Sequence, residues 1–169
     1  PEGFEVLDNK IALPPTDISW YSDSETSFTL STVRELAGLA ELVNNGISFE
    51  GKIITLGANI DLAETEWTPI GNKSDDLPFS GVFDGNNKTI SNLTLDLNDT
   101  SGYYGMFGYL SGAVIKDIDF VGANVSGGFR LGVLCGYADS STTMEGITVD
   151  DTSIVSNTRH AAGICGESD

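Results

Sequence analysis

The chain has 169 residues, 40% of them hydrophobic, and carries 25 Asp and Glu against eight Lys and Arg, for a formal net charge of −17. This size and apolar content suit one domain with its own core, and 20 glycines against five prolines favour a turn-rich all-β chain. The excess of acidic residues argues against nucleic acid as a partner. No apolar run approaches the ~20 residues that a membrane-spanning helix requires.

Residues 1–28 are polar and irregular, but they include a few large apolar side chains, among them Ile18, Trp20 and Tyr21. A free linker would gain nothing from Trp20, because linkers are depleted in aromatic residues. We therefore expect residues 1–28 to form an extended N-terminal arm that lies on the domain.

Residues 29–46 contain a helix, which the apolar spacing predicts over 32–45. Thr32 followed by Glu35 forms a capping box, and Gly46 can adopt the left-handed conformation that ends a helix. We expect this amphipathic helix to cap the open end of the β-structure that follows, whose first coil would otherwise expose its core.

Residues 47–169 carry short β-rich runs and two repeated patterns. The first places an apolar pair before a glycine, in Gly105-Met106-Phe107-Gly108, Val133-Leu134-Cys135-Gly136 and Gly163-Ile164-Cys165-Gly166. The second occurs as Ile90-x-x-Leu93-x-Leu95, Ile115-x-x-Ile118-x-Phe120 and Met144-x-x-Ile147-x-Val149. The closing glycines of the first pattern lie 28 (136 − 108) and 30 (166 − 136) residues apart, a spacing typical of a solenoid.

These repeats predict an all-β fold, a right-handed parallel β-helix that forms a three-faced solenoid with an N-terminal capping α-helix. Right-handed crossovers are the rule for parallel strands. Like side chains should stack inside the coil, so we expect Leu93, Ile118 and Ile147 to pair in successive order. Because the chain stops at Asp169 within a repeat, we expect the rungs to be truncated at the C-terminal end.

Several segments match a known family in their order along the chain: Asp17-Ile-Ser-Trp-Tyr21, residues 28–46, residues 49–62, Trp67-Thr-Pro-Ile-Gly71 and residues 79–85. Together with the glycine repeats, they resemble the GLUG-motif surface proteins of bacteria over nearly the whole chain from Asp17. The resemblance implies a right-handed β-helix, secreted or displayed on the cell surface, that acts in adhesion or carbohydrate contact. It supplies no catalytic residues, and Cys135 and Cys165 depart from the small aliphatic residue usual in the motif.

The glycine motif places Met106 and Phe107 in neighbouring columns, and both cannot face inward on a regular strand. We expect the N-terminal arm to cover the outer column, with a partner surface as the alternative. Cys135 and Cys165 share one column. Stacked parallel side chains seldom reach the dihedral angle of a disulfide, so we interpret both as buried free thiols, with a disulfide as the alternative.

Carboxylates on adjacent coils would indicate a glycosidase or a Ca²⁺-dependent lyase. Asp119 aligns with threonines and Asp117 with Asn92 and Gly146, so neither column places a second acid on a neighbouring coil. Asp117 and Asp119 share one face of a strand and form a weak candidate cation site, although a solvated strand surface is the simpler interpretation. We predict no catalytic residues, no cofactor and no other metal site.

The candidate ligand-binding residues gather around the glycine motifs and are Tyr103, Tyr104, Tyr109, Tyr137, Arg130, Arg159 and His160. Tyr109 and Tyr137 follow their glycines in register and could stack against a sugar, although aromatic ladders also simply stabilise solenoids. Arg130 and His160 occupy equivalent positions and could bind an acidic sugar, although salt bridges to the many acids are the plainer interpretation.

The sequence thus favours a non-catalytic adhesion or scaffold module, outside a bacterial cell, that presents loops to a glycan or a host extracellular protein. One alternative is a polysaccharide-active β-helix enzyme, a lyase or glycosidase, whose catalytic rungs lie partly beyond Asp169. The other alternative is a structural stalk.

Overall fold

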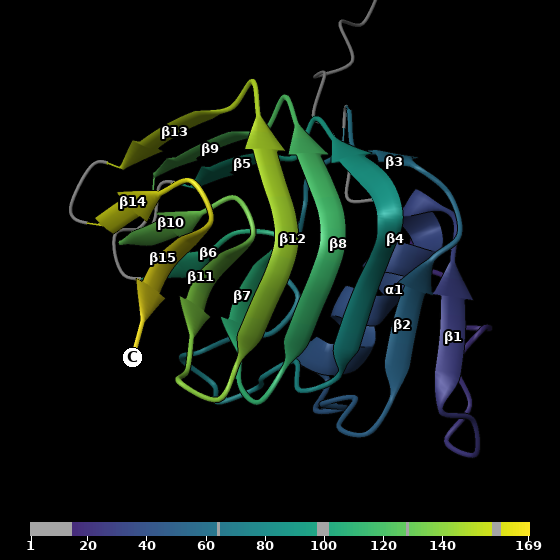
Figure 1. Ribbon diagram of the computed structural model, residues 1–169. Coiled ribbons are helices and arrows are strands. Elements are labelled where there is room, and N and C mark those ends of the chain that lie inside the picture. Colours follow the sequence, from purple (N-terminus) through teal and green to yellow (C-terminus); the bar gives the residue numbers. More distant parts are fainter. Residues whose placement is uncertain (1–14, 64, 98–101, 128, 157–159) are drawn as a thin grey trace, which may run out of the picture.

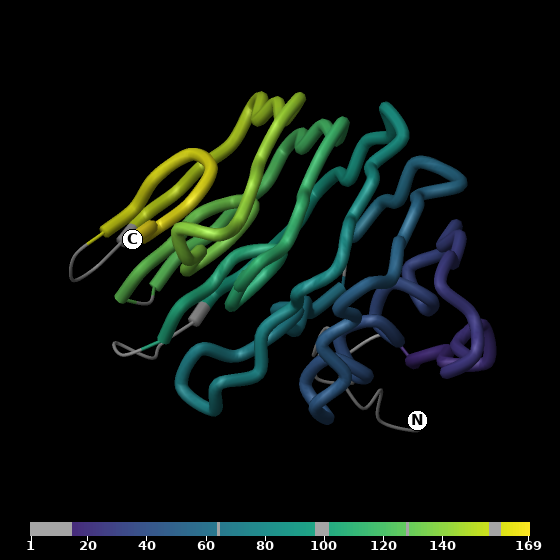
Figure 2. The backbone as a smooth tube through the Cα atoms, turned by 60° about the horizontal axis from the view of Figure 1, so that its bottom comes forward, coloured from purple at the N-terminus to yellow at the C-terminus, as the bar shows by residue number. Residues whose placement is uncertain are grey.

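The computed structural model describes residues 15–63, 65–97, 102–127, 129–156 and 160–169. Its strands pair in parallel and stack as a β-solenoid, with one helix in the described ranges (Figure 1). The longest sheet has the order β1-β2-β4-β8-β12, so the described chain makes about five turns, each of which we call a coil. Figure 2 shows the coils stacked in sequence order from the N-terminal to the C-terminal end.

The described residues form four parallel sheets along the solenoid. The long sheet contains β1 (Ser27–Leu30), β2 (Ile53–Leu56), β3 (Ile60–Asp61), β4 (Val82–Ser91), β8 (Val114–Val121) and β12 (Thr143–Asp150). The second contains β5 (Thr94–Leu97), β9 (Asn124–Gly127) and β13 (Ser153–Ser156); the third contains β6 (Tyr103–Tyr104), β10 (Arg130–Gly132) and β14 (His160–Ala162). The fourth contains β7 (Phe107–Leu110), β11 (Cys135–Ala138) and β15 (Cys165–Ser168). The all-β parallel solenoid is confirmed, and its strands are divided among four sheets where the sequence predicts three faces.

The helix α1 (Val33–Asn44) has the ends that the sequence predicts. The Thr32 hydroxyl accepts a hydrogen bond from the Glu35 N–H, and the Glu35 carboxylate accepts one from the Thr32 N–H, so the capping box is complete. Gly46 has φ of 99°, the left-handed conformation expected after the last turn. The apolar face of α1 joins the core shared with the strands.

The strands begin earlier than the sequence analysis places them. β1 precedes α1 and pairs with β2 in register from Ser27↔Ile53 to Leu30↔Leu56, so a strand lies within the segment interpreted as arm and helix. The described part of the arm packs at this end of the solenoid, where the Trp20 and Tyr21 rings contact Phe28 and Phe49 at centroid distances of 5.2 to 6.1 Å.

The predicted ladders are confirmed for one step and wrong for the step before it. Between β8 and β12 the pairs are Ile115↔Met144, Ile118↔Ile147 and Phe120↔Val149, as the repeats predict. Between β4 and β8, however, Ile118 pairs with Lys88, and Leu95 pairs with Val125 of β9. Leu93 therefore does not stack beneath Ile118.

The error arises at a bend in the long strands. Asn86 and Asn87 of β4 both have positive φ, whereas β8 has one such residue, Asp117, and β12 has Gly146. The sequence separation of paired residues in β4 and β8 consequently falls from 32 (114 − 82) before the bend to 30 (118 − 88) after it. The pattern that begins at Ile90 thus lies five residues further along the coil than its spacing predicts, because Ile90 pairs with Phe120 and not with Ile115 (120 − 115).

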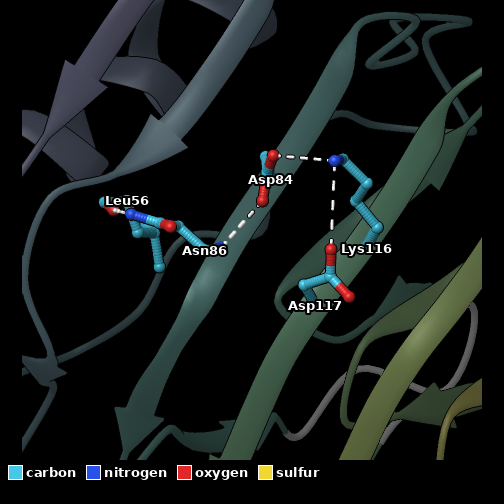
Figure 3. Close-up of polar contacts among 5 residues, drawn as sticks. All are labelled: Leu56, Asp84, Asn86, Lys116 and Asp117. Atoms are coloured by element: carbon cyan, nitrogen blue, oxygen red, sulfur yellow. Dashed lines mark hydrogen bonds and ion pairs between the residues drawn. The ribbon is translucent and has the colours of Figure 1, made fainter.

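Polar side chains hold this bend (Figure 3). Asn86 donates from its amide side chain to the Leu56 carbonyl at 3.1 Å and from its backbone N–H to Asp84 at 2.8 Å. The Lys116 ammonium lies 2.8 Å from the Asp84 carboxylate and 3.9 Å from that of Asp117. These contacts tie three successive coils together.

Both columns of the glycine motif face the core, so the prediction that the arm covers one of them is wrong. Met106, Phe107, Leu134 and Cys135 are each 0% exposed. The backbone bends at residues 105–106 and 133–134 between the third and fourth sheets, so side-chain alternation along a regular strand does not apply there.

The closing position of the motif, Gly136 or Gly166, requires glycine because backbone atoms of the preceding coil lie against it. A Cβ atom at Gly136 would lie 2.3 Å from the carbonyl carbon of Tyr103 and from the amide nitrogen of Tyr104. A Cβ at Gly166 would lie 2.7 Å from the Leu131 nitrogen. Each closing glycine therefore allows the fourth sheet to approach the third-sheet strand of the preceding coil.

Candidate binding site

The third and fourth sheets bring the predicted tyrosines and Arg130 together. The third sheet aligns Tyr103, Arg130 and His160 in one column, and the fourth aligns Tyr109 with Tyr137. The columns meet because the two strands of each coil are separated only by the glycine motif. One cluster therefore spans adjacent coils.

The rings of Tyr109 and Tyr137 are closed to solvent. Their centroids lie 5.6 Å apart, and the side chains are only 7% and 8% exposed. The Lys73 ammonium lies over both rings, 4.3 and 4.6 Å from the centroids, a cation–π arrangement. These faces are already packed, so a stacked sugar would have to displace Lys73.

Tyr103 and Arg130 form the neighbouring part of the cluster. The Tyr103 ring lies edge-on to Tyr137 at 5.7 Å, and the Arg130 guanidinium lies 4.8 Å from the Tyr103 centroid. Arg130 also donates to the Tyr103 hydroxyl at 3.2 Å and forms an ion pair with Glu167. The Tyr137 hydroxyl donates to Asp169, a bond that raises the pKa of Tyr137 to about 12. Arg130 is thus paired within the protein.

A cavity of about 470 Å³ opens beside Tyr103. It is lined by Asn44, Thr68, Pro69, Gly71, Asn72, Ser74, Asp75, Leu77, Gly102, Tyr103 and Tyr104. Hydroxyl, amide and carboxylate groups therefore line it together with two half-buried aromatic rings. The geometry makes this cavity, and not the Tyr109–Tyr137 pair, the place where a polar ligand has room.

The loop at residues 71–77 gives the cavity a defined wall. Asn72 and Leu77 exchange two backbone hydrogen bonds of 2.8 and 2.9 Å, and the Asn72 amide donates to Asp75 at 2.8 Å. The Asn44 amide, at the end of α1, bonds both the Pro69 carbonyl and the Gly71 N–H at 3.0 Å. The wall is therefore fixed to the helix.

The remaining predicted residues lie elsewhere. His160 is exposed on β14, in register with Arg130, and Arg159 lies outside the described residues. Asp117 contacts Lys116, and Asp119 accepts a hydrogen bond from Thr148 on the next coil. No group of three potential metal ligands occurs among the residues that the structure describes.

Sequence reasoning missed the cavity loop, including Lys73 and Asp75. The signal was present, because Ile70-Gly71 is an earlier copy of the glycine motif: Ile70 pairs with Phe107 through an isolated bridge. Aligning Gly71 with Gly108 would have placed the residues after it beside Tyr109. The 37-residue spacing (108 − 71) hid this copy, since it exceeds that of the later repeats.

Comparison with known proteins shows a similarity to a much longer protein. The chain is 30% identical over 152 residues to Halomucin of Haloquadratum walsbyi, a match that covers 82% of this chain. The chain spans about 2% of the length of that relative. No family model and no solved structure matches the chain. Within the described ranges, no helix is long and apolar enough to cross a membrane.

Proposed function

We propose that this protein is a non-catalytic adhesion or scaffold module, outside the cell, that binds a saccharide in the cavity beside Tyr103. The observation that carries the proposal is the lining of this cavity, where polar side chains surround half-buried aromatic rings. Ligand sites combine apolar or aromatic walls with a few placed polar groups, and this cavity lies within their usual size range.

A saccharide matches this lining better than a charged ligand does. Its hydroxyl groups both donate and accept, as the exposed Asn72 and Ser74 side chains also can, and the exposed Asp75 carboxylate can accept from them. The Arg130 guanidinium is held by Glu167 and Tyr103, and Asp75 adds negative charge to the wall. A neutral sugar therefore suits the site better than an acidic one.

The finer features of the fold and family belong to the same proposal. We assign the solenoid a right-handed path from the general rule for parallel crossovers, and we assign α1 the role of an N-terminal cap from its place at the β1 end. The ordered segments that resemble GLUG-motif surface proteins support a secreted or surface location in bacteria. The similarity to Halomucin is consistent with a surface location.

Saccharide binding is tested on a glycan array with matched variants. Asp75→Asn changes an exposed cavity carboxylate, and Asp96→Asn makes the same change on β5, away from the cavity. We expect array signal for the natural chain and Asp96→Asn, and a loss of at least about tenfold, the value of one good hydrogen bond, for Asp75→Asn. Tyr103→Ala should abolish the signal.

The same preparations separate the alternatives. Absence of signal on the array would favour a stalk that spaces other domains, since a stalk needs no ligand. Release of reducing or unsaturated sugars from a polysaccharide panel would favour the enzyme, because only cleavage generates such ends. Either result would contradict the proposal.

A further inference from the structure

Cys135 and Cys165 lie opposite one another on neighbouring coils. They are direct partners in the parallel pairing of β11 with β15, and the structure holds both as free cysteines. Directly paired strands lie about 4.8 Å apart, within the Cα separation that a disulfide spans. Closing the bond requires the two Cβ atoms to approach slightly, because stacked side chains start a little too far apart.

The two thiols differ in their surroundings. Cys135 is 0% exposed in the core, whereas Cys165 is half-buried. β15 pairs with β11 in parallel, from Cys135↔Cys165 to Ala138↔Ser168. Cys165 is therefore accessible to an oxidant, and Cys135 lies where it can attack the oxidised sulfur of Cys165.

The two thiols also differ in acidity. A hydrogen bond from Cys135 lowers the pKa of Cys165, while burial, followed by the interaction with Cys165, raises the pKa of Cys135. The thiolate is the nucleophilic form of cysteine, and oxidation selects the thiol with more thiolate character and more exposure. Both the geometry and the chemistry single out Cys165 as the first residue to react.

We propose that Cys135 and Cys165 are a site of oxidative modification, at which a hydroperoxide converts the two thiols into a disulfide between adjacent coils. The Cys165 thiolate attacks the peroxide, the O–O bond breaks, and a sulfenic acid forms with release of an alcohol, or of water from hydrogen peroxide. Cys135 then gives up its proton and attacks the sulfenic sulfur, the S–O bond breaks, and water leaves. Two thiols are oxidised, and one peroxide is reduced.

The disulfide fastens the C-terminal coil. The coil from β12 to β15 is mostly exposed or half-buried, with Val155 and Ile164 at 52% and 40% exposure. In the 169-residue chain this coil therefore buries fewer side chains than the coils before it, and local opening of that chain is expected to start there. A covalent link from β15 to buried β11 suppresses that opening.

Mapping of the cysteines after hydrogen peroxide treatment tests the proposal on the 169-residue chain. Trypsin cleaves after Arg130 and Arg159, so Cys135 and Cys165 fall in separate peptides, 131–159 and 160–169. We expect these two peptides to be linked after oxidation and separated by a reductant. Oxidation should also raise Tm by about 5–10 °C, as expected for a loop of this size.

Two single variants identify the order of events. In Cys165→Ser, buried Cys135 should stay reduced at the same peroxide dose; in Cys135→Ala, Cys165 should form a sulfenic acid that dimedone traps. The proposal is overturned if the natural chain yields only unlinked peptides, or if Cys165 is found linked to a second copy. Sulfinic acid at Cys165 in the natural chain would also overturn it, because Cys135 would then be out of reach.

Discussion

Ser111 donates a hydrogen bond of 2.6 Å to Asp139, which lies one coil further along the solenoid. The same carboxylate accepts from the Gly112 N–H, the Ser141 N–H and the Thr142 hydroxyl at 3.1 to 3.2 Å. It thus joins the turn before β8 to the turn before β12. This contact fixes the spacing of the two coils at the edge of the long sheet.

Replacing Asp139 by alanine should weaken the fold. The change removes several hydrogen bonds to a charged acceptor and leaves two backbone donors to be satisfied by water, with an expected cost of about 1–2 kcal/mol. Asp96→Ala is the control, since Asp96 accepts from Ser126 on the next coil but its side chain is exposed and accepts from fewer donors. Urea denaturation should show a lower midpoint for the first variant, and equal midpoints would contradict the role assigned to Asp139.

The same carboxylate predicts a dependence on pH. Partial burial opposes ionisation, but hydrogen bonds from Ser111, Ser141, Gly112 and Thr142 outweigh it and hold the pKa of Asp139 below its ordinary value of 3.8. A lowered folded-state pKa gives stability that is fully present above 3.8 and is lost as the pH falls below that value. Asp139→Asn should therefore show a smaller loss of stability on acidification than the natural chain, and parallel profiles would argue against this account.

Replacement by alanine should destabilise the fold strongly at one glycine of the repeat and hardly at all at another. At Gly136 the added methyl group would meet backbone atoms at 2.3 Å, whereas at Gly163 nothing lies within 4 Å. Backbone cannot move aside as a flexible side chain does, so Gly136→Ala should cost about 2–3 kcal/mol. Gly163→Ala should stay within about 0.5 kcal/mol of the natural chain. Thermal unfolding measures both, and equal effects would show that the fourth sheet does not depend on close approach at Gly136.

The helix and the pairing of the later coils could be predicted from a local motif and from the repeat. The capping box of Thr32 and Glu35 was correct, since both partners lie within one turn of helix. The pairing of Ile118 with Ile147 was also correct, because the offset between β8 and β12 stays at 29 residues (147 − 118) on both sides of the bend. Leu93 was misplaced because β4 has two extra residues at the bend and Lys88 opposite Ile118, so the matching positions of β4 do not follow the apolar spacing of the later repeats.

The candidate site was less accessible to prediction. Tyr103, Tyr137 and Arg130 were identified through the repeat, and the structure does bring them together. The cavity itself depends on the loop at residues 71–77 and on Asn44 of α1, which lie outside the later repeats. Contacts between a helix end and a loop 27 residues away follow from the packing of the first coils, which no local pattern specifies.

The core column through the glycine motif offers a test of burial along the solenoid. Leu134 is 0% exposed, whereas Ile164, the equivalent residue of the next coil, is 40% exposed. Leu134→Ala should therefore cost about 3 kcal/mol through loss of apolar contact and the cavity left behind. Ile164→Ala should cost about 1 kcal/mol or less. Denaturant titration compares the two, and a larger effect at Ile164 would indicate that this coil is covered in solution.

A saccharide bound in the cavity beside Tyr103 would change the surroundings of the backbone amides that line it. Titration of the ¹⁵N-labelled chain with the saccharide that gives the strongest array signal, followed by backbone amide shifts, measures this change. The account predicts shift changes concentrated at residues 68–77 and 102–104, and their loss in Asp75→Asn. Changes confined to the Trp20 and Tyr21 end of the solenoid, or no changes with any saccharide, would contradict it.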